Sequence, residues 1–485
     1  MKNSALIIDN VNRYSKNDIA SESRCAVHIL GGKIVDITPP FPEPCGINII
    51  DARGATLIPG LHDHHIHLSA YASSLTSLAC GSPTLETRQQ LIDQICQYGK
   101  QRPGEWLRGY GYHPYLAGDI DRDWLDQHVP DNPVRIQHRS GRLWVLNSLA
   151  LRQLGLIKQT KLAIPQAIPK GAEIIKGRYT GRLFEEDAWL SAQLSQKMPG
   201  FKPASEKLAS FGVTGITDCS PRNSTNEFDY FQQSQLNGEL QQSVRMMGDS
   251  NLIQAGYSPR LKTAELKLHL LEAKLPEFDH ICQQVRVSRQ QGRRVAVHCV
   301  SRTELVFALT VLRECGTSKG DRLEHAGVVP PELMQRITEL ELSVVTQHHF
   351  LREQGDRYLE QVEQDDQQWL YLGQSFLSAG VPLAAGSDAP FGSADPWISM
   401  DSAVRRQSRS GVLMGAQERL TPEQSLDLFI SCPQLPGRRY RHIEIGEQAD
   451  LCLLDAPWHF VRNDLNSRHC RVTISSGQII YEKDN

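Results

Sequence analysis

The sequence predicts an α/β fold built around a TIM-like (β/α)8 barrel, and three features of its 485 residues lead to that prediction. Short strand-like segments gather near both ends of the chain. The region between them alternates eight short apolar strands with helical stretches. Several of those strands end in a histidine, lysine or aspartate, as expected where catalytic groups stand at the carboxyl ends of barrel strands.

The two ends of the chain are expected to pair with each other. Turns such as Gly31-Gly32 and Ser476-Gly477 separate short alternating segments at each end. Residues 1–57 and 435–485 therefore predict one small β-sandwich that brings the termini together. Its segments are Ala5–Asp9, Cys25–Leu30, Lys33–Ile37, Asp450–Asp455, Cys470–Ile474 and Gln478–Tyr481.

Residues 58–434 are expected to form the barrel. The first strand would continue from the apolar segment Thr56–Ile58 past Gly60 into a run of histidines. Most strands are followed by a helical pattern, which is typical of a parallel barrel. The other seven strands are Gly215–Cys219, Ser243–Met247, Glu265–Leu270, Arg294–Cys299, Arg322–His325, Leu342–Thr346 and Val381–Asp388.

Nearly 150 residues separate the first predicted strand from the second, which indicates an insertion over residues 69–205. It holds two further strand-like segments, Trp106–Tyr112 and Pro133–His138. Because long loops after barrel strands lie on the catalytic face, we expect this insertion to cover the active site.

Pro59–Leu68 is the most informative segment, because four of the 17 histidines fall within six of its residues. Period-two alternation along a strand would place His65 and His67 on one face. Neutral imidazole is the commonest protein ligand for transition metals, so this pair predicts half of a metal site. The alternative is a polar loop that happens to be rich in histidine.

Polar residues at other strand ends extend that prediction. Each has a simpler interpretation when taken alone: His298 as a hydrogen-bonded core residue, Lys267 as a surface residue, Asp388 as a helix cap. Together they favour a metal site. The complete candidate set is His65, His67, Lys267, His298, His325 and Asp388.

Composition excludes several classes of function. A net charge of −3 and a pI near 6.6 give no basis for binding nucleic acid or an anionic membrane. The sequence shows no signal peptide and no apolar run long enough to span a membrane. The 11 cysteines are scattered and never spaced as CxxC, which fits reduced thiols in a cytoplasmic protein.

The chain resembles the amidohydrolase superfamily, in the long branch that includes N-substituted formamide deformylase-like proteins. The likeness spans nearly the whole chain. Pro59–His67 matches the family's PGxxDxHxH opening, Arg322–His325 its R-x-E-H element, and Gly386–Asp388 its final S-D. Weaker likenesses are Gly212–Asp218 to a GVTT-like strand, Trp144–Leu151 to a WVNSAAL segment, and Gly446–Leu451 to G-x-x-A-D-L.

The resemblance implies one or two divalent metal ions, with zinc as the expected metal and manganese or iron as alternatives. His65, His67 and Asp388 would hold one ion, and His298 and His325 a second. Lys267 matches the position of a lysine carbamate that bridges two metals, although His269, Lys262 and Lys274 lie close by. Asp388 would also be the catalytic base.

The chain departs from the branch pattern where substrate would bind. Arg142 follows Ser140-Gly141 where relatives carry histidine, and Arg302 follows the fifth strand. Two guanidinium groups would suit a carboxylate-bearing substrate, with surface ion pairs as the alternative. His113, and His348 or His349, are further candidates for substrate contact.

The expected function is therefore hydrolysis of a non-peptide C–N bond of a small molecule (an amide, N-formyl or cyclic amide), which places the enzyme in EC 3.5. One alternative is a deaminase or another metal-dependent reaction on a small heterocycle. Another is a non-catalytic scaffold that binds a small ligand. A homo-oligomer is left open by the sequence.

Overall fold

The computed structural model describes residues 5–16, 23–41, 48–81, 84–157, 169–194, 198–252 and 258–484. The chain divides into two compact units, which are described separately. One comprises residues 1–68 with 200–485, and the other comprises residues 69–199.

The larger unit contains a sheet of eight strands that pair in sequence order, every pair parallel. This confirms the predicted eight-stranded barrel-like sheet. β15 begins four residues earlier than expected, and β19 is shorter than the predicted Val381–Asp388. The strands are β6 (Leu61–Ile66), β13 (Val213–Asp218), β14 (Ser243–Gly248), β15 (Leu261–His269), β16 (Val295–Cys299), β17 (Arg322–His325), β18 (Ser343–Thr346) and β19 (Leu383–Ala385).

The first and last barrel strands approach each other and nearly close the barrel. The amide of Asp388 donates to the carbonyl of His65 at 2.7 Å, and the amide of His67 donates to the carbonyl of Ala389 at 3.0 Å. Gly386 permits this approach, because a Cβ there would lie 2.4 Å from the backbone nitrogen of His65. The seam therefore sets Asp388 beside the histidine segment.

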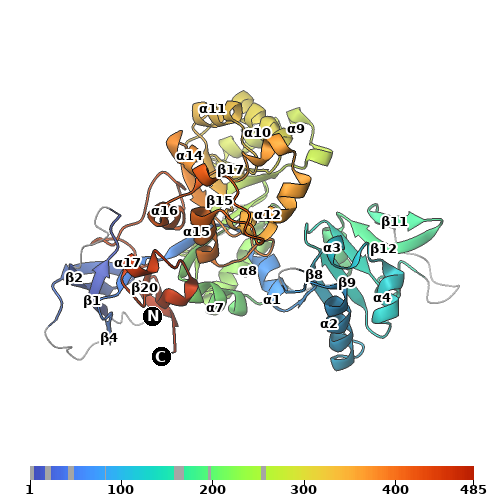
Figure 1. Cartoon of the computed structure of the whole chain (residues 1–485), viewed down its shortest axis with the longest axis horizontal. Coiled ribbons are helices and arrows are strands. Elements are labelled where there is room, and N and C mark those ends of the chain that lie inside the picture. Colours follow the sequence, from blue (N-terminus) through green and yellow to red (C-terminus); the bar gives the residue numbers. More distant parts are fainter. Residues whose placement is uncertain are drawn as a thin grey trace. The chain divides into compact units, whose positions relative to one another are not determined.

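Helices follow most barrel strands, as predicted, and surround the sheet (Figure 1). Local sequence explains where several begin: Ser301 and Thr421 form capping boxes before α10 and α16, and a proline opens α11, α15 and α16. The helices of this unit are α7 (Lys202–Ser210), α8 (Thr225–Leu236), α9 (Phe278–Gln290), α10 (Arg302–Cys315), α11 (Pro331–Glu339), α12 (His349–Gln361), α13 (Gln364–Gln367), α14 (Gln374–Ser378), α15 (Pro396–Arg405), α16 (Pro422–Ile430) and α17 (Trp458–Val461).

Strands from both chain ends form a second sheet in the same unit, in the order β22-β21-β20-β5-β1-β2-β3, with β4 paired to β1. The ends of the chain therefore pair, as expected. The sheet is continuous through its strands, so the predicted two-layered sandwich is not confirmed. Its strands are β1 (Leu6–Arg13), β2 (Arg24–Leu30), β3 (Lys33–Thr38), β4 (Asn48–Asp51), β5 (Thr56–Pro59), β20 (Leu451–Leu454), β21 (Cys470–Ser475) and β22 (Gln478–Glu482).

The expectation of one strand running from Thr56 into the histidines is wrong. The chain makes two strands separated at Gly60: β5 belongs to the terminal sheet and β6 to the barrel. A Cβ at Gly60 would lie 2.3 Å from Cγ2 of Thr214, so only glycine lets the chain pass so close to β13. Gly60 is therefore the point at which the chain passes from one sheet to the other.

Residues 69–199 form a six-stranded sheet in the order β11-β12-β10-β9-β8-β7. The two predicted strands are present as β8 and β9. The predicted insertion ended at residue 205, whereas this unit ends at Pro199. Its elements, after α1 (Leu68–Leu75), are β7 (Leu78–Ala79), α2 (Arg88–Gln101), β8 (Leu107–Tyr112), α3 (Pro114–Ala117), α4 (Arg122–His128), β9 (Val134–His138), β10 (Leu143–Leu146), α5 (Ser148–Gln153), β11 (Ala172–Ile175), β12 (Arg178–Phe184) and α6 (Asp187–Gln193). Coverage of the active site by residues 69–205 stays a prediction.

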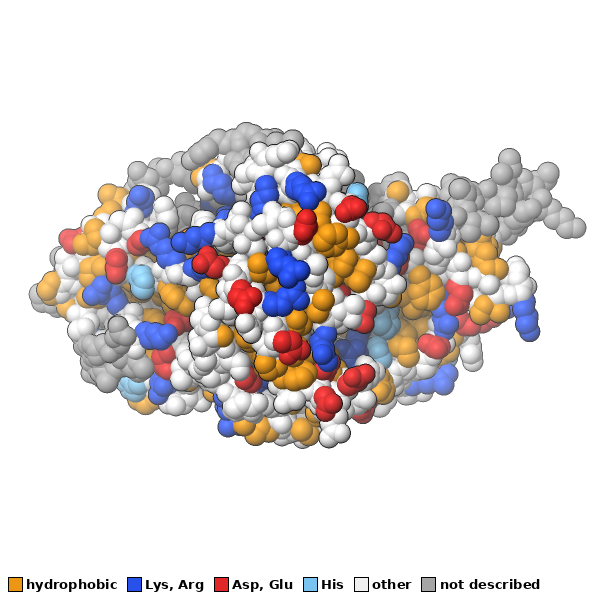
Figure 2. All heavy atoms as spheres, turned by 90° about the horizontal axis from the view of Figure 1, so that it is seen from above, with side chains coloured by type: hydrophobic (Ala, Val, Ile, Leu, Met, Phe, Trp, Pro, Cys, Tyr) orange, Lys and Arg blue, Asp and Glu red, His pale blue; other side chains and the backbone are white. Residues whose placement is uncertain are grey.

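Among the described residues, the mixture of surface charges and the state of the cysteines agree with the expectations from composition. Figure 2 shows Lys and Arg side chains interspersed with Asp and Glu on the face that it displays. None of the helices in the described ranges combines the length and apolar character that crossing a bilayer requires. The ten described cysteines are free thiols, and Cys45 lies outside the described residues.

Candidate metal centre

The six predicted ligands gather at the carboxyl ends of barrel strands. His65 and His67 lie at the end of β6, His298 near the end of β16, and His325 is the last residue of β17. Asp388 follows β19, and Lys267 lies in the last third of β15. Parallel strands bring these ends to one face of the sheet, which is where barrel enzymes place catalytic groups.

Asp388 is at the centre of the group. Its Oδ1 lies 3.4 Å from Nε2 of His65 and 3.2 Å from Nε2 of His67. His65, His325 and Asp388 each offer a ligand atom, and these three atoms lie within 4.8 Å of one another. Buried imidazole nitrogens beside a carboxylate are the donors that zinc and related divalent metals take, so these residues fit a metal ion.

His298 and Lys267 extend the cluster on the neighbouring strands. The ring centroid of His298 lies 4.5 Å from that of His325. Lys267 is buried, its Nζ lies 3.9 Å from Oε2 of Glu324, and that Nζ has no hydrogen-bond partner among the described residues. An ammonium group in such a place is poorly solvated, so modification to a carbamate fits this position chemically. His269, considered as an alternative to Lys267, is exposed, with its ring 4.4 Å from that of His298.

The protonation states of His298, His325 and Asp388 suit metal binding. Burial lowers the pKa of His325 to about 3. Burial, together with the nearby His325, also lowers the pKa of His298 well below its usual range. Burial alone would raise the pKa of Asp388, but hydrogen bonds from His65 and His67 outweigh it and hold that pKa well below normal. His298 and His325 are therefore neutral imidazoles near neutral pH, and Asp388 is an ionised carboxylate. Burial alone would lower the pKa of His65, but the nearby Cys219 and Glu324 and the hydrogen bond to Asp388 hold it well above its usual range, so a metal ion there would have to displace a proton.

Three partners that sequence reasoning did not assign orient the histidines through Nδ1. Nδ1 of His65 contacts Oε2 of Glu324. The other two Nδ1 contacts are His67 to Oγ of Ser220 at 3.2 Å and His325 to Oε1 of Gln347 at 2.7 Å. These contacts leave each Nε2 available for a metal, as hydrogen-bonded partners of ligating histidines commonly do.

Glu324 is the one carboxylate among these three partners, and it is completely buried. Its Oε1 accepts a hydrogen bond from Nε of Arg322 at 2.5 Å, and both side chains are completely buried. Burial alone would raise the pKa of Glu324, but the charges of Arg322, Lys267 and His65 hold it well below normal. The sequence signal that could have identified Glu324 is the alternation in β17, which places Glu324 on the same strand face as Arg322.

Glu324→Gln should weaken metal binding about 10–100-fold, because the orienting carboxylate on His65 loses its charge. It should also lower the free energy of unfolding by about 3–5 kcal/mol, since Arg322 would keep a buried charge without its partner. Chelator competition and urea unfolding measure the two effects. Glu332→Gln, on the exposed part of α11, is the matched control. Unchanged metal affinity in a folded Glu324→Gln protein would contradict a positioning role for this carboxylate.

The backbone is strained at two predicted ligands. His325 has φ of 70° and Asp388 has φ of 51°, both in the left-handed region that residues with a side chain seldom adopt. Such conformations cost on the order of 1–3 kcal/mol and cluster at functional sites. His325 is the last residue of β17, and Asp388 lies three residues after the end of β19, so both stand where the chain leaves the barrel sheet.

Two predicted substrate residues, His113 and Arg142, belong to the unit of residues 69–199. His113 caps α3, where its ring accepts a hydrogen bond from the amide of Tyr115 at 3.2 Å. Arg142 is exposed, with Nε 3.8 Å from Oε1 of Glu185. Their predicted role in binding substrate stays a prediction.

The other predicted substrate residues lie in the barrel unit. Nη1 of Arg302 donates to Oδ1 of Asp366 at 2.9 Å, an ion pair of the kind considered as the alternative to substrate binding. His349 is fully buried, and its Nε2 donates to the carbonyl of Ser387 at 3.0 Å, directly before Asp388. His348 is also buried, and burial lowers its pKa to about 3. The contacts of His349 therefore support the strand end that carries Asp388.

Comparison with known proteins agrees with this geometry. The chain is 26% identical over 496 residues to N-substituted formamide deformylase of Arthrobacter pascens, and 24% identical over 501 residues to the putative amidohydrolase YtcJ of Bacillus subtilis, with 90% of each chain covered in both cases. Its fold is similar to that of an uncharacterised metal-dependent hydrolase from Pyrococcus horikoshii, with a TM-score of 0.75 and 20% identity over 96% of this chain and 100% of the other. The model of the amidohydrolase family matches residues 48–481. The chain therefore belongs to the amidohydrolase family.

Proposed function

We propose that this protein is a metal-dependent hydrolase that cleaves a non-peptide C–N bond of a small molecule. The observation that carries the proposal is the convergence of His65, His67, His325 and Asp388 at one end of the barrel. An amide, an N-formyl amine or a cyclic amide is the proposed substrate class.

In this proposal His65, His67 and Asp388 would hold one metal ion, His298 and His325 would hold a second, and Lys267, as a carbamate, would supply a further oxygen ligand. Zinc is the proposed metal, because the donors are imidazole nitrogens and carboxylate oxygens. A bound zinc lowers the pKa of a coordinated water to roughly 7 and polarises a carbonyl oxygen. The neutral His298 and His325 and the ionised Asp388 are in the forms that such binding requires.

Asp388 is the proposed general base. Its carboxylate is ionised and buried, and Nε2 atoms of His65 and His67 lie at 3.4 and 3.2 Å from its Oδ1. It would take the proton of the attacking water and pass that proton to the departing nitrogen, as general acid–base catalysis requires. His349 would hold the backbone before Asp388 in place during both transfers.

The substrate class has support from one relative. The protein from Arthrobacter pascens is named for deformylating N-substituted formamides, and the likeness to it covers 90% of both chains. The cluster of predicted ligands is buried, and a charged substrate group buried beside it would need a partner of opposite charge. A substrate that is small and largely uncharged at the scissile bond is therefore favoured. N-formyl amines are therefore the first substrates to test.

The metal-loaded full-length protein should hydrolyse at least one compound in a panel of N-formyl amines, N-acetyl amines and cyclic amides. Release of a carboxylate and an amine, measured together by mass spectrometry, is the expected result. Dialysis against a chelator should remove the activity, and added zinc should restore it. Release of ammonia from amino-heterocycles would instead establish the deaminase alternative. Stoichiometric metal without turnover of any compound would contradict the proposal and favour a ligand-binding scaffold.

A further inference from the structure

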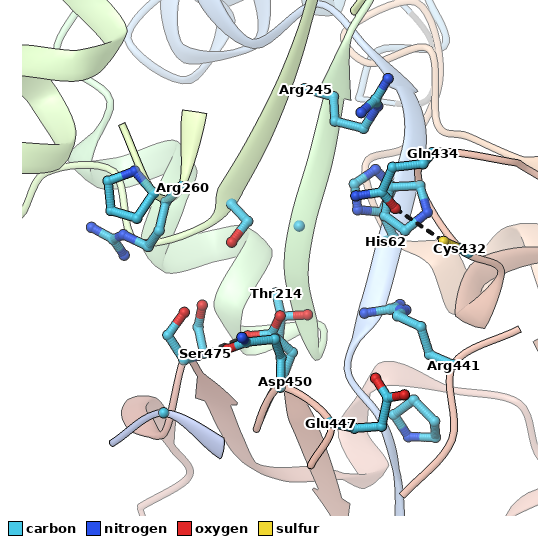
Figure 3. A pocket seen from close by; sticks show the side chains of 18 of the residues that line it. His62, Thr214, Arg245, Arg260, Cys432, Gln434, Arg441, Glu447, Asp450 and Ser475 are labelled. Atoms are coloured by element: carbon cyan, nitrogen blue, oxygen red, sulfur yellow. Dashed lines mark hydrogen bonds between the residues drawn. The ribbon is translucent and has the colours of Figure 1, made fainter. Parts of the chain in front are cut away.

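A second site-like feature lies at the opposite end of the barrel from the metal centre. A cavity of about 750 Å³ opens at the amino-terminal ends of β6, β13, β14 and β15 (Figure 3). His62, Thr214, Arg245 and Lys262 line it from these strands. Since the predicted metal ligands occupy the carboxyl ends of the barrel strands, this cavity is separate from the proposed catalysis.

The opposite wall comes from the terminal sheet. The turn Gly31-Gly32, residues Ser475 and Ser476, and the segment from Glu447 to Asp450 contribute to it. Backbone hydrogen bonds fix these parts to one another: the amide of Ala449 donates to Gly32 at 2.9 Å, and the amide of Gly477 donates to Ala449 at 3.0 Å. The cavity is thus built between rigid elements, which small-molecule sites generally require.

Cationic side chains outnumber carboxylates around the cavity. Five of its lining residues are cationic (Arg245, Arg260, Lys262, Arg439 and Arg441), and three carry carboxylates (Glu444, Glu447 and Asp450). Glu444 and Glu447 are exposed. Asp450 is engaged already, because its Oδ1 accepts the amide of Ser476 at 2.7 Å. The space therefore has an excess of positive charge.

The guanidinium groups of Arg260 and Arg441 are half-buried and have the same nearby carboxylate, that of Asp450. Arg441 donates to the carbonyls of Gly60 and Phe429, and its buried Nε has no partner among the described residues. Arg260 also donates to carbonyls, those of Gln241 at 3.0 Å and Gln235 at 3.5 Å. Burial lowers the pKa of both Arg260 and Arg441. Carbonyl partners carry no net charge, so the one carboxylate of Asp450 is left to balance two guanidinium groups.

Arg245 lies between the cavity and the barrel interior. Its Nη2 lies 3.3 Å from Oε1 of Glu265, a carboxylate that Arg294 also approaches at 3.4 Å. The buried Nε of Arg245 has no hydrogen-bond partner in the described part of the chain. Figure 3 shows Arg245, Arg260 and Arg441 on three sides of the cavity.

The guanidinium groups around the cavity favour an oxyanion as its ligand. Guanidinium groups bind carboxylate and phosphate through paired N–H donors, and the volume lies within the range of about 300–1,000 Å³ usual for small-molecule pockets. We infer that this cavity binds a small organic anion bearing a carboxylate or a phosphate group, independently of the metal centre. The ligand balances the positive charge of the arginines that line the cavity, which are Arg245, Arg260, Arg439 and Arg441.

Isothermal titration of the metal-loaded full-length protein tests the inference, with inorganic phosphate in one arm and succinate in the other. Saturable binding of one molecule per chain is expected for at least one probe, and the responding arm identifies the anionic group. Arg439→Gln should weaken that binding about 10-fold or more, as expected for loss of a charge-assisted hydrogen bond. Arg439 suits this test because it is exposed, and its side chain makes no hydrogen bond or ion pair to the described residues. Arg260→Gln is the second variant.

Two control variants test whether the anion binds in this cavity rather than elsewhere on the protein. Arg313→Gln, on the exposed part of α10 and outside the cavity, makes the same charge change and should leave binding unaltered. His65→Ala should also bind the anion normally, because the metal centre is a different site. Failure of saturable binding for both probes would overturn the inference. So would equal effects of Arg439→Gln and Arg313→Gln, or binding that disappears in His65→Ala.

Discussion

Asp388→Asn should lower kcat by about 10²–10⁴-fold, the range expected when a general base is removed. Asparagine keeps an oxygen that can face a metal and nearly the same shape, but it cannot accept the proton of an attacking water. The reduction should therefore appear mainly in kcat, with much of the bound metal retained. Steady-state kinetics and elemental analysis on the same preparation measure the two quantities.

Asp401→Asn provides the matched control for that variant. Asp401 pairs with Arg352 and Arg405 on the surface of α15, away from the predicted ligands. It should leave kcat and metal content unchanged. If Asp388→Asn keeps full kcat with its metal bound, Asp388 is not the base, and the proton must be taken by another group.

His65→Ala should abolish measurable turnover and reduce the bound metal below stoichiometry. His65 is the residue that connects the cluster, because Nε2 faces Asp388 while Nδ1 contacts Glu324. Removing the imidazole deletes one ligand and leaves the buried Glu324 carboxylate without that partner. The unfolding free energy of the metal-free protein should therefore fall by on the order of 1–3 kcal/mol. Elemental analysis, activity and urea unfolding provide the measurements.

His280→Ala is the control for this second prediction, because His280 is exposed on α9 and outside the cluster. His65→Asn serves as a second variant if the alanine protein does not fold. Added imidazole that restores metal and turnover to His65→Ala would show that only the ligand was lost. Unchanged metal content in a folded His65→Ala protein would move the metal site elsewhere.

Much of the barrel could be predicted because its signals are local. A short apolar run followed by a helical pattern identifies a buried parallel strand, and seven of the eight predicted runs are barrel strands in the structure. The run before His65 lies in β5 of the terminal sheet. The boundaries were less well predicted. β5 and β6 were expected to be one strand, and only the contact between Gly60 and Thr214 shows why the chain breaks there.

The terminal sheet shows the same limit. Its strands were predicted from their turns and alternation, and β20 pairs with β5 as the pairing of the two ends required. Whether paired strands form one sheet or two depends on hydrogen bonds between segments distant in sequence, such as β1 beside β5. Alternation within a strand carries no information on that choice, so it does not distinguish a sandwich from one continuous sheet.

For the candidate site, the sequence alone indicated which residue types would bind the metal and in which order they follow one another from His65 to Asp388. Strand periodicity and position at strand ends are properties of short segments, and they can be read without the fold. The folded chain was needed to show that Glu324, 259 residues away, contacts Nδ1 of His65, and that His325 and Asp388 have left-handed backbone. The same holds for the cationic cavity, whose walls come from barrel strands and terminal turns. Such neighbours are set by barrel closure and strand register, which depend on the packing of the whole chain.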